Sequence, residues 1–216
     1  MVIQYCGRYS YRGVRKALLE IKHDVVIVGS GLAALRAAVE LAEEHDVAVV
    51  TKVFPSRAHS GAAQGGVAAS LGNEDEDNWL WHTFDTVKGS DYLGDQAAIE
   101  TMCKDAPRAV IELEHMGVPF SRSKDGKIAQ RAFGGHTRDY GKAPVKRACY
   151  CSERTGRVIL DTLFEQCLRL NVKFYSEYQV IDISIDDGRV KGGTLFELSS
   201  GELHPFACKS LLLAAG

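Results

Sequence analysis

Two stretches of the chain hold residues whose types and spacing could do chemistry. The first is a glycine-rich turn of pattern GxGxxA, from Gly29 to Ala34. The first glycine of such a turn permits a tight bend, the second lets a pyrophosphate approach the backbone, and a small third residue lets helix and strand pack closely. Unpaired N–H groups at the helix N-terminus then face the phosphates. The turn predicts a dinucleotide site; the alternative is a strand–helix turn without a ligand.

The second stretch places His59 among the small residues of segment 53–73. Glycine, alanine and serine let the backbone approach a flat ring system, and backbone N–H groups can donate to ring acceptors. Spacing alone leaves two interpretations of His59 open. The imidazole contacts a ligand, or it caps a local turn.

The end of the second apolar run limits which dinucleotide fits. Val47–Val50 is followed by Thr51 and Lys52, where an NAD site commonly has an acidic residue for the ribose hydroxyl. Thr51 can still hydrogen-bond a ribose, and Lys52 can meet a phosphate. The missing acid counts against a plain NAD site.

A polar, basic and glycine-containing segment, Gln130–Arg147, holds the apolar aromatic residue Phe133 among its basic ones. Two interpretations are open: a solvated loop, or an anion-facing loop whose aromatic side chain packs on a ligand. His136 lies in the same segment and receives no role.

Hydrophobic periodicity predicts the elements that position these residues. A continuous apolar run at His23–Val28 is typical of a parallel strand covered on both faces. Apolar residues from Leu32 to Glu44 recur at helical spacing, and the next strand starts at Asp46. The glycine-rich turn therefore lies inside a predicted β–α–β unit.

Helices and short strands fill the rest of the chain. Helices are expected at 74–89 with an acidic first turn, at 95–104, at 105–115 with Asp105 as N-cap and Pro107 in the first turn, and at 152–170. Strands are expected at 173–175, in an antiparallel meander over 178–185, 189–198 and 202–207, and at 211–216. The plan is an α/β, Rossmann-like FAD-binding domain of the two-dinucleotide-domain flavoprotein type. A lead of residues 1–21 precedes this domain, which is assigned to 22–216 and expected to be incomplete.

Composition disfavours several classes of protein. The 216 residues include 26 Lys and Arg against 28 Asp and Glu, so charge gives no case for nucleic acid as a partner. No apolar run approaches the roughly 20 residues that span a bilayer. The six cysteines form no CxxC pair, which disfavours a zinc or iron–sulfur cage, and Cys149 and Cys151 are interpreted as ordinary thiols. Without an apolar signal core at the N-terminus, the cytoplasm is the expected compartment.

The sequence resembles the flavoprotein subunit of succinate dehydrogenase and fumarate reductase over residues 22–216. Three motifs carry the resemblance: the turn from Gly29 to Ala34, the segment KVFPSRAHSGAAQGG at 52–66, and RAFGG at 131–135 followed by SERTG at 152–156. The resemblance implies that FAD is the cofactor and that His59 bonds covalently to its flavin ring. It also implies that Gly66 and Phe133 face a dicarboxylate. The implied FAD-binding residues are Gly29, Ser30, Gly31, Leu32, Ala33, Ala34, Thr51, Lys52, Ser56, Arg57, Ala58, Ser60, Ala63, Gln64, Gly65, Gly66 and Val180.

The resemblance further implies interconversion of succinate and fumarate by hydride transfer to or from the flavin. Electrons would pass to an iron–sulfur subunit and, through it, to membrane-anchor subunits and a quinone. That arrangement places the chain at the inner, cytoplasmic face of a membrane. The arginine that shuttles the proton is expected beyond Gly216, so these 216 residues alone are expected not to turn over.

Three other functions stay open on the sequence. One is an L-aspartate oxidase, a relative of the same fold that usually lacks a histidine at the position of His59. The others are a non-catalytic FAD-binding module and a plain NAD dehydrogenase. A covalently bound flavin would disfavour the L-aspartate oxidase and the NAD dehydrogenase.

Overall fold

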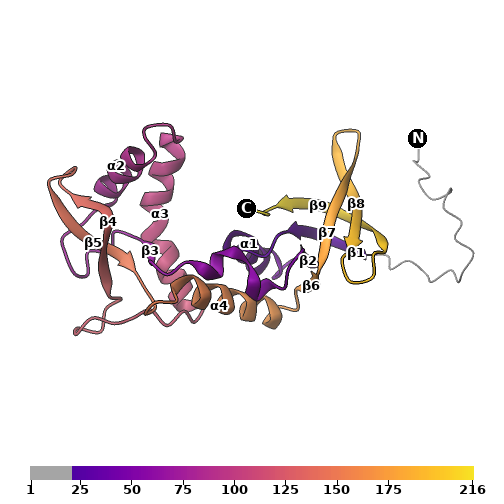
Figure 1. Ribbon diagram of the computed structural model, residues 1–216, viewed down its shortest axis with the longest axis horizontal. Helices are drawn as coiled ribbons and strands as arrows, with labels where there is room; N and C mark the ends of the chain where they lie inside the picture. Colours follow the sequence, from indigo (N-terminus) through magenta and orange to yellow (C-terminus); the bar gives the residue numbers. More distant parts are fainter. Residues whose placement is uncertain (1–20) are drawn as a thin grey trace, which may run out of the picture.

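A computed structural model describes residues 21–216, so the expected lead lies outside the described residues except for Ile21, which begins the first strand. The molecule is elongated. A six-stranded sheet lies at one end, and two helices with a three-stranded sheet lie at the other (Figure 1). The helices are α1 (Leu32–Leu41), α2 (Trp79–Gly89), α3 (Gln96–His115) and α4 (Thr155–Arg169).

The larger sheet has the strand order β6-β2-β1-β9-β8-β7. Its strands are β1 (Ile21–Val28), β2 (Val47–Thr51), β6 (Lys173–Ser176), β7 (Tyr178–Asp186), β8 (Arg189–Glu197) and β9 (Leu203–Leu213). The first four strands in this order, β6, β2, β1 and β9, pair in parallel. The strands β9, β8 and β7 pair antiparallel. The predicted α/β architecture, its β–α–β start and its antiparallel meander are confirmed.

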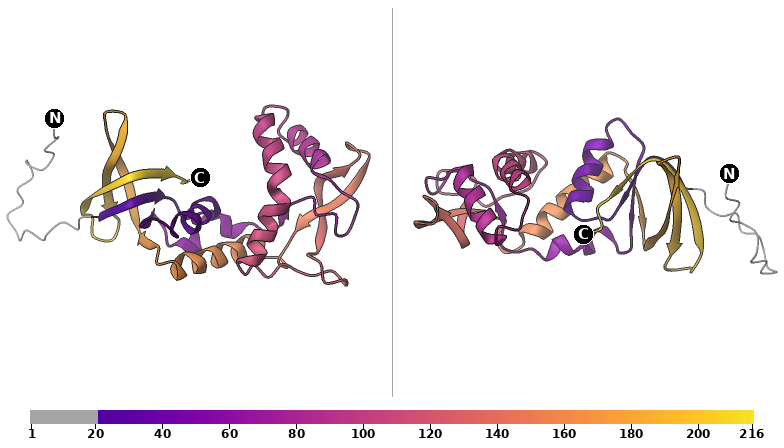
Figure 2. Two further views of the ribbon diagram at one scale, coloured as in Figure 1. Left: turned by 180° about the vertical axis from the view of Figure 1, so that it is seen from behind. Right: turned by 90° about the horizontal axis from the view of Figure 1, so that it is seen from above.

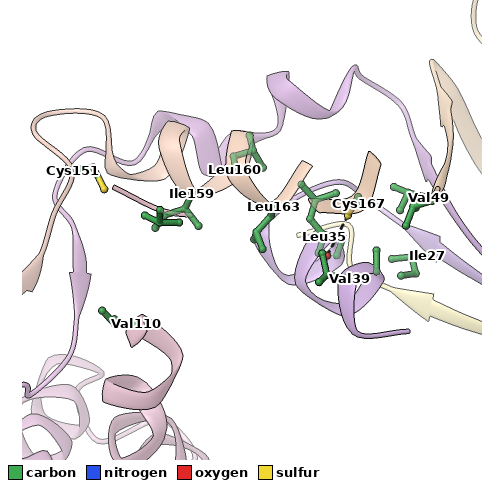
Figure 3. Close-up of a cluster of buried hydrophobic side chains, with 14 of the residues drawn as sticks. Ile27, Leu35, Val39, Val49, Val110, Cys151, Ile159, Leu160, Leu163 and Cys167 are labelled. Carbon is green, nitrogen blue, oxygen red and sulfur yellow. Dashed lines mark hydrogen bonds between the residues drawn. The ribbon is translucent and has the colours of Figure 1, made fainter. Parts of the chain in front are cut away.

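Both faces of the central strands are covered, which explains why they read as continuous apolar runs rather than alternating ones. Ile27 and Val49 face a core that α1 and α4 complete with Leu35 and Leu163 (Figure 3). Figure 3 also shows the Cys167 thiol of α4 directed at the Leu35 carbonyl oxygen, 3.6 Å away. The alternate residues of β1 and β2, such as Val26 and Val50, pack on the opposite face of the sheet, against residues of β8 and β9. The end of β1 is thereby fixed from both sides.

Two predicted boundaries are wrong, one between two helices and one between two strands. The expected separate helices at 95–104 and 105–115 are one helix, α3, with Pro107 inside it. An internal proline costs about 3 kcal/mol, but the fully buried Cys103 and Val110 on either side of it offset that cost. The last two predicted strands, at 202–207 and 211–216, are likewise one strand, β9, because it pairs with β8 and β1 in succession.

The predicted acidic first turn of the 74–89 helix is also wrong. Helix α2 begins at Trp79, and the Asn78 side chain caps it by accepting from the N–H groups of Leu80 and Trp81 at 3.0 and 3.1 Å. The acidic residues 74–77 precede the helix. The side chain of one of them, Asp77, is 0% exposed.

The segment interpreted as a solvated or anion-facing loop is instead a β-hairpin. It forms the smaller sheet with strand order β3-β5-β4, made of β3 (Val67–Ala68), β4 (Gln130–Arg138) and β5 (Ala143–Cys149). The solvated interpretation is wrong for Arg147, which has 0% exposure and pairs with buried carboxylates, whereas residues 132–135 and 138–142 of the segment are exposed. Figure 2 shows from two further sides that this hairpin, with α2 and α3, stays apart from the larger sheet.

The cysteines of the hairpin end behave as ordinary thiols. Cys149 and Cys151 are buried and free. Burial raises the pKa of the Cys149 thiol to about 12, so it is protonated and unreactive at neutral pH. Among the helices of the described part, none is long and apolar enough to cross a membrane.

Candidate functional site

A cavity of about 590 Å³ lies at the carboxyl ends of β1 and β2, beside the N-terminus of α1. In open α/β sheets this edge is where ligands bind. Its volume is in the ordinary range for a cofactor site. Predicted residues in its wall are Gly29, Ser30, Gly31, Leu32, Ala33, Thr51, Lys52, Ala58, His59, Ser60 and Val180.

The glycine-rich turn is shaped by close backbone packing. Gly29 has φ +112°, and a Cβ built on it would lie 2.1 Å from the carbonyl oxygen of Ala214. Only glycine can let β1 turn this close to the end of β9. Gly31 follows as the N-cap of α1 and has no side chain to cap the helix. The Leu32 N–H makes a long bond of 3.4 Å to the Ser60 hydroxyl, and the N–H groups after it in the first turn can face an anion. Ala34 lies outside the cavity wall, fully buried between helix and sheet.

A chain of hydroxyl groups links the two strand ends under the cavity. The Ser30 and Thr51 hydroxyl oxygens are 2.8 Å apart, and the Thr51 hydroxyl donates to the Val53 carbonyl oxygen at 2.9 Å. Both side chains are buried. Thr51 therefore orders Ser30 and the chain after β2, with one acceptor lone pair left for a ribose.

His59 stands at the start of the short 3-10 turn η2 (His59–Ala62), after the turn η1 (Pro55–Arg57). Its side chain is exposed and lies in the cavity wall. Proline at 55 begins η1, and small residues keep the chain close to α4. The imidazole is presented to the cavity rather than buried as a packing group.

Residues of α4 donate hydrogen bonds to backbone carbonyl oxygens of this loop. The Gly156 N–H donates to the Ala63 carbonyl oxygen at 2.8 Å, and Arg157 donates to the Ser56 carbonyl oxygen at 2.9 Å. A Cβ on Gly156 would lie 2.2 Å from the Ser60 carbonyl oxygen. His59 therefore lies on a segment that hydrogen bonds and close packing hold against α4.

The predicted residues Gln64 to Gly66 lie past η2, outside the cavity wall. Arg131 of β4 donates to the carbonyl oxygens of Gln64 and Gly65 at 2.7 and 3.0 Å, and its guanidinium stacks 4.6 Å from the Tyr150 ring. Phe133, two residues on and 55% exposed, lies against Gly65, where an added Cβ would be 2.8 Å from its ring. Ser56, Arg57 and Ala63 also lie outside the wall. The structure therefore brings the predicted residues together in two adjoining groups.

Part of the cavity wall was not predicted from the sequence. Tyr178 and Gln179, which begin β7 just before Val180, line it, as do Ala214 and Ala215 after β9. For Ala214 and Ala215 a signal was present. Parallel strands that neighbour β1 must end at the same edge of the sheet, so the residues after β9 lie beside the turn.

The donor set fits a dinucleotide with a flat ring. The start of α1, where the one side-chain contact among the described residues is the long bond from the Leu32 N–H to Ser60, provides N–H groups for a pyrophosphate. The cavity wall near η2 is built from small residues around one imidazole. Gly31 leaves room there: a Cβ on it would approach the Ser60 hydroxyl to 3.3 Å. The cavity can hold an anion at one end and a planar group beside His59 at the other.

Comparison with known proteins gives concordant matches. The family model described as FAD binding domain matches residues 24–216. The succinate dehydrogenase flavoprotein subunit of Rickettsia felis is 52% identical over 201 residues, which cover 92% of this chain and 34% of that protein. The apo Sdh1 complex of Mycobacterium smegmatis aligns with a TM-score of 0.83 and 34% identity, over 91% of this chain and 34% of the other. A variant of Escherichia coli quinol fumarate reductase aligns with a TM-score of 0.82 and 32% identity, over 92% and 33%.

The coverage is as informative as the identity. The chain spans about a third of the length of the curated relatives it matches. What it shares with them is the region that contains the cavity, the His59 loop and the β4–β5 hairpin.

Proposed function

Because the chain belongs to the FAD binding domain family, we propose that it is the cofactor-holding part of a flavoprotein subunit that interconverts succinate and fumarate. FAD is the cofactor of the family. The similarity to succinate dehydrogenase flavoprotein subunits supports this substrate pair. One structural observation carries the proposal most: an exposed imidazole, His59, faces a dinucleotide-sized cavity from a clamped loop of small residues.

The residues of the cavity would divide the cofactor between them. Backbone N–H groups at the start of α1 would bind the pyrophosphate. The backbone near Val180 would contact the adenine, and the segment from His59 to Gly66 would lie along the flavin. Bound FAD supplies a two-electron acceptor for the hydride of the substrate.

His59 would attach the cofactor covalently. A neutral imidazole nitrogen is a nucleophile, and it would bond to the 8α-carbon of the flavin in place of one hydrogen of that methyl group. That hydrogen and the imidazole N–H hydrogen would leave as protons, and the two electrons would pass through the bound flavin to an oxidant such as dioxygen. The attached imidazole withdraws electron density from the ring and so favours acceptance of a hydride from succinate. The clamped turn η2 would keep the nitrogen in place for this bond.

Phe133 and the backbone N–H of Gly66 would face the dicarboxylate. Arg131 supports that arrangement by fixing the carbonyl groups of Gln64 and Gly65, which leaves the next N–H group oriented by the loop. The proton-shuttling arginine is proposed to belong to a region outside these 216 residues, so this part alone would not turn over. Electrons would leave to an iron–sulfur subunit and, through it, to membrane-anchor subunits, at the cytoplasmic face of a membrane.

The test compares the protein, produced as its gene encodes it, with a His59→Ser variant. The wild-type protein should keep its flavin after acid precipitation, and succinate should bleach the flavin absorbance. The variant should release its FAD on acid treatment and lose reduction by succinate. Bleaching by L-aspartate rather than succinate would replace this proposal with an aspartate oxidase, and acid-released flavin in the wild type would exclude the covalent bond.

A further inference from the structure

The β4–β5 hairpin contains a bulge that carries Phe133, and one side of this bulge is tied to a fully buried ion cluster. We propose that Arg147 and Asp85 are positioning residues that hold the bulge, and with it Phe133, in the orientation that meets a dicarboxylate. The inference rests on the proposed function, in which Phe133 faces the substrate. It adds residues that touch neither substrate nor cofactor.

The bulge is visible in the pairing of the two strands. Ala132 pairs with Lys146, and the next pair is Thr137 with Pro144. Residues 133–136 of β4 therefore face a single residue of β5, and the surplus residues project from the sheet. No ladder bond of the hairpin fixes this projecting segment, so its two ends must be held by other groups.

The upstream end of the bulge is fixed through the loop of small residues. Arg131 donates to the carbonyl oxygens of Gln64 and Gly65, as described above. Gln130, just before it, donates to the carbonyl oxygens of Ala69 and Arg147 at 2.7 and 3.2 Å. These side chains hold the strand up to Ala132.

The downstream end is fixed by Thr137, whose three polar backbone and side-chain groups are all bound. Its N–H donates to Asp85 Oδ2 at 2.7 Å, and its hydroxyl donates to Asp85 Oδ1 in a short bond. Its carbonyl oxygen accepts from Arg147 Nη2 at 2.9 Å. Asp85 belongs to α2 and Arg147 to β5, so the residue that follows the bulge is held by two different elements.

The ion cluster that binds Thr137 is a rigid support because its buried charges are paired with one another and are shielded from water. Arg147 donates from Nε and Nη2 to Asp77 at 2.7 Å each, and from Nη1 to Asp85 at 2.8 Å. The side chains of these three residues are 0%, 0% and 7% exposed. Removing water from such charges costs several kcal/mol per ion, and the attraction between the charges offsets this cost only when their geometry is good. We therefore infer that the cluster holds Thr137 in a single position, because any other arrangement leaves a buried charge unpaired.

Phe133 needs such support because it has little of its own. Its ring is 55% exposed and contacts Gly65 and His136, and the two ring centroids of Phe133 and His136 lie 5.8 Å apart. Gly134 and Gly135 follow it and leave the backbone free to move. The position of the ring is therefore set by the two ends of the bulge rather than by packing around it.

A double-mutant cycle with Thr137→Val and Phe133→Ala tests the inference in the FAD-loaded protein as its gene encodes it. Valine matches threonine in shape and removes one bond to Asp85, so we expect the KM for succinate to rise about fivefold, with kcat and covalent flavin content unchanged. Phe133→Ala should raise the KM more. The double variant should have the same KM as Phe133→Ala, because Thr137 no longer has a Phe133 ring to position.

Two further variants complete the experiment. Thr83→Val, also on α2, removes a hydroxyl bonded to the Trp79 carbonyl oxygen and should leave the KM unchanged. Arg147→Lys keeps the charge, but an ammonium cannot reach Asp77, Asp85 and Thr137 as a planar fork does. It should raise the KM in the wild-type background and not in the Phe133→Ala background.

The outcomes separate this inference from the proposed function. Additive effects in the cycle, or a Thr137→Val effect no larger than that of Thr83→Val, would overturn the inference while leaving the substrate role of Phe133 intact. An unchanged KM in Phe133→Ala would remove that role and the inference with it. A KM rise accompanied by flavin loss in Thr137→Val would show a merely structural contact and would also overturn it.

Discussion

The two ends of the molecule hold their ligand-facing residues by different physical means. At the sheet end the glycine-rich turn is set by close backbone packing and by a pair of buried hydroxyl groups, above an apolar core. At the hairpin end Phe133 is carried by a bulge that depends on a buried arginine and two buried aspartates. The first end is therefore vulnerable to added volume, and the second to removed charge.

Substitutions at Gly29 should give the largest effect, because there the sheet end has no spare volume. We expect Gly29→Val to destabilise the protein by about 5 kcal/mol through a disallowed backbone conformation and overpacking together, and to abolish FAD retention. Denaturant titration and flavin absorbance measure the two effects.

A matched glycine separates crowding from backbone strain in that experiment. Gly126 also has a positive φ, +77°, but a Cβ there would meet no atom within 4 Å. Gly126→Ala should cost only about 1 kcal/mol and leave FAD bound. Equal losses in the two variants would show that crowding does not define the sheet end.

The hairpin end should respond most to Arg147→Met. Two buried carboxylates would lose their cation, and breaking a buried ion pair in this way costs about 3–5 kcal/mol. Arg108 provides the control: it also pairs with two carboxylates, at 3.7 and 3.1 Å, but its side chain is 71% exposed. Arg108→Met should change the free energy of unfolding by less than about 1 kcal/mol, and a similar result for Arg147→Met would contradict the comparison.

Acid should destabilise the hairpin end through His82 of α2. Burial, with the positive charge of Arg147 next, lowers the pKa of His82 to about 4. Because this folded pKa lies below the unfolded value of about 6.5, the unfolded chain binds the extra proton. The contribution is present above pH 6.5 and lost as the pH falls towards 4, by about 3 kcal/mol at most.

The variant that checks this pH dependence is His82→Phe. Its free energy of unfolding should fall less steeply than that of the wild type between pH 6.5 and 4. Identical slopes in urea titrations across that range would show that His82 is not the responsible group.

The smallest effect is expected at the Ser30–Thr51 pair of the sheet end. Ser30→Ala removes one buried hydrogen bond and leaves the Thr51 hydroxyl bonded to the Val53 carbonyl oxygen. The expected cost is about 1 kcal/mol, with a modest rise in the Kd for FAD. A loss as large as that of Gly29→Val would mean that hydroxyl groups, not close packing, define this end.

The sheet end could be predicted from sequence because its determinants are local and periodic. The GxGxxA turn, the apolar runs of β1 and β2 and the turn signals of the meander each lie within a few residues of what they specify. Even there, the continuity of β9 was missed, since only pairing with two strands in succession joins its two halves.

The hairpin end could not be predicted in this way because its determinants are far apart in the chain. Arg147 is buried only because Asp77 and Asp85, some seventy and sixty residues away, come to meet it. A basic residue in a polar segment is normally solvated, so nothing local distinguishes it. The helix across Pro107 has the same origin, since tertiary burial of its neighbours overrides a local stop signal.

The central claim is that His59 carries the flavin, and peptide mass spectrometry tests it most directly. Trypsin releases residues 58–88 as one peptide, which contains two histidines, His59 and His82. Fragmentation of this peptide from the wild-type holoprotein should locate a mass increase of one FAD on His59. An unmodified His59 in a protein that has bound FAD, or the added mass on His82, would contradict the account.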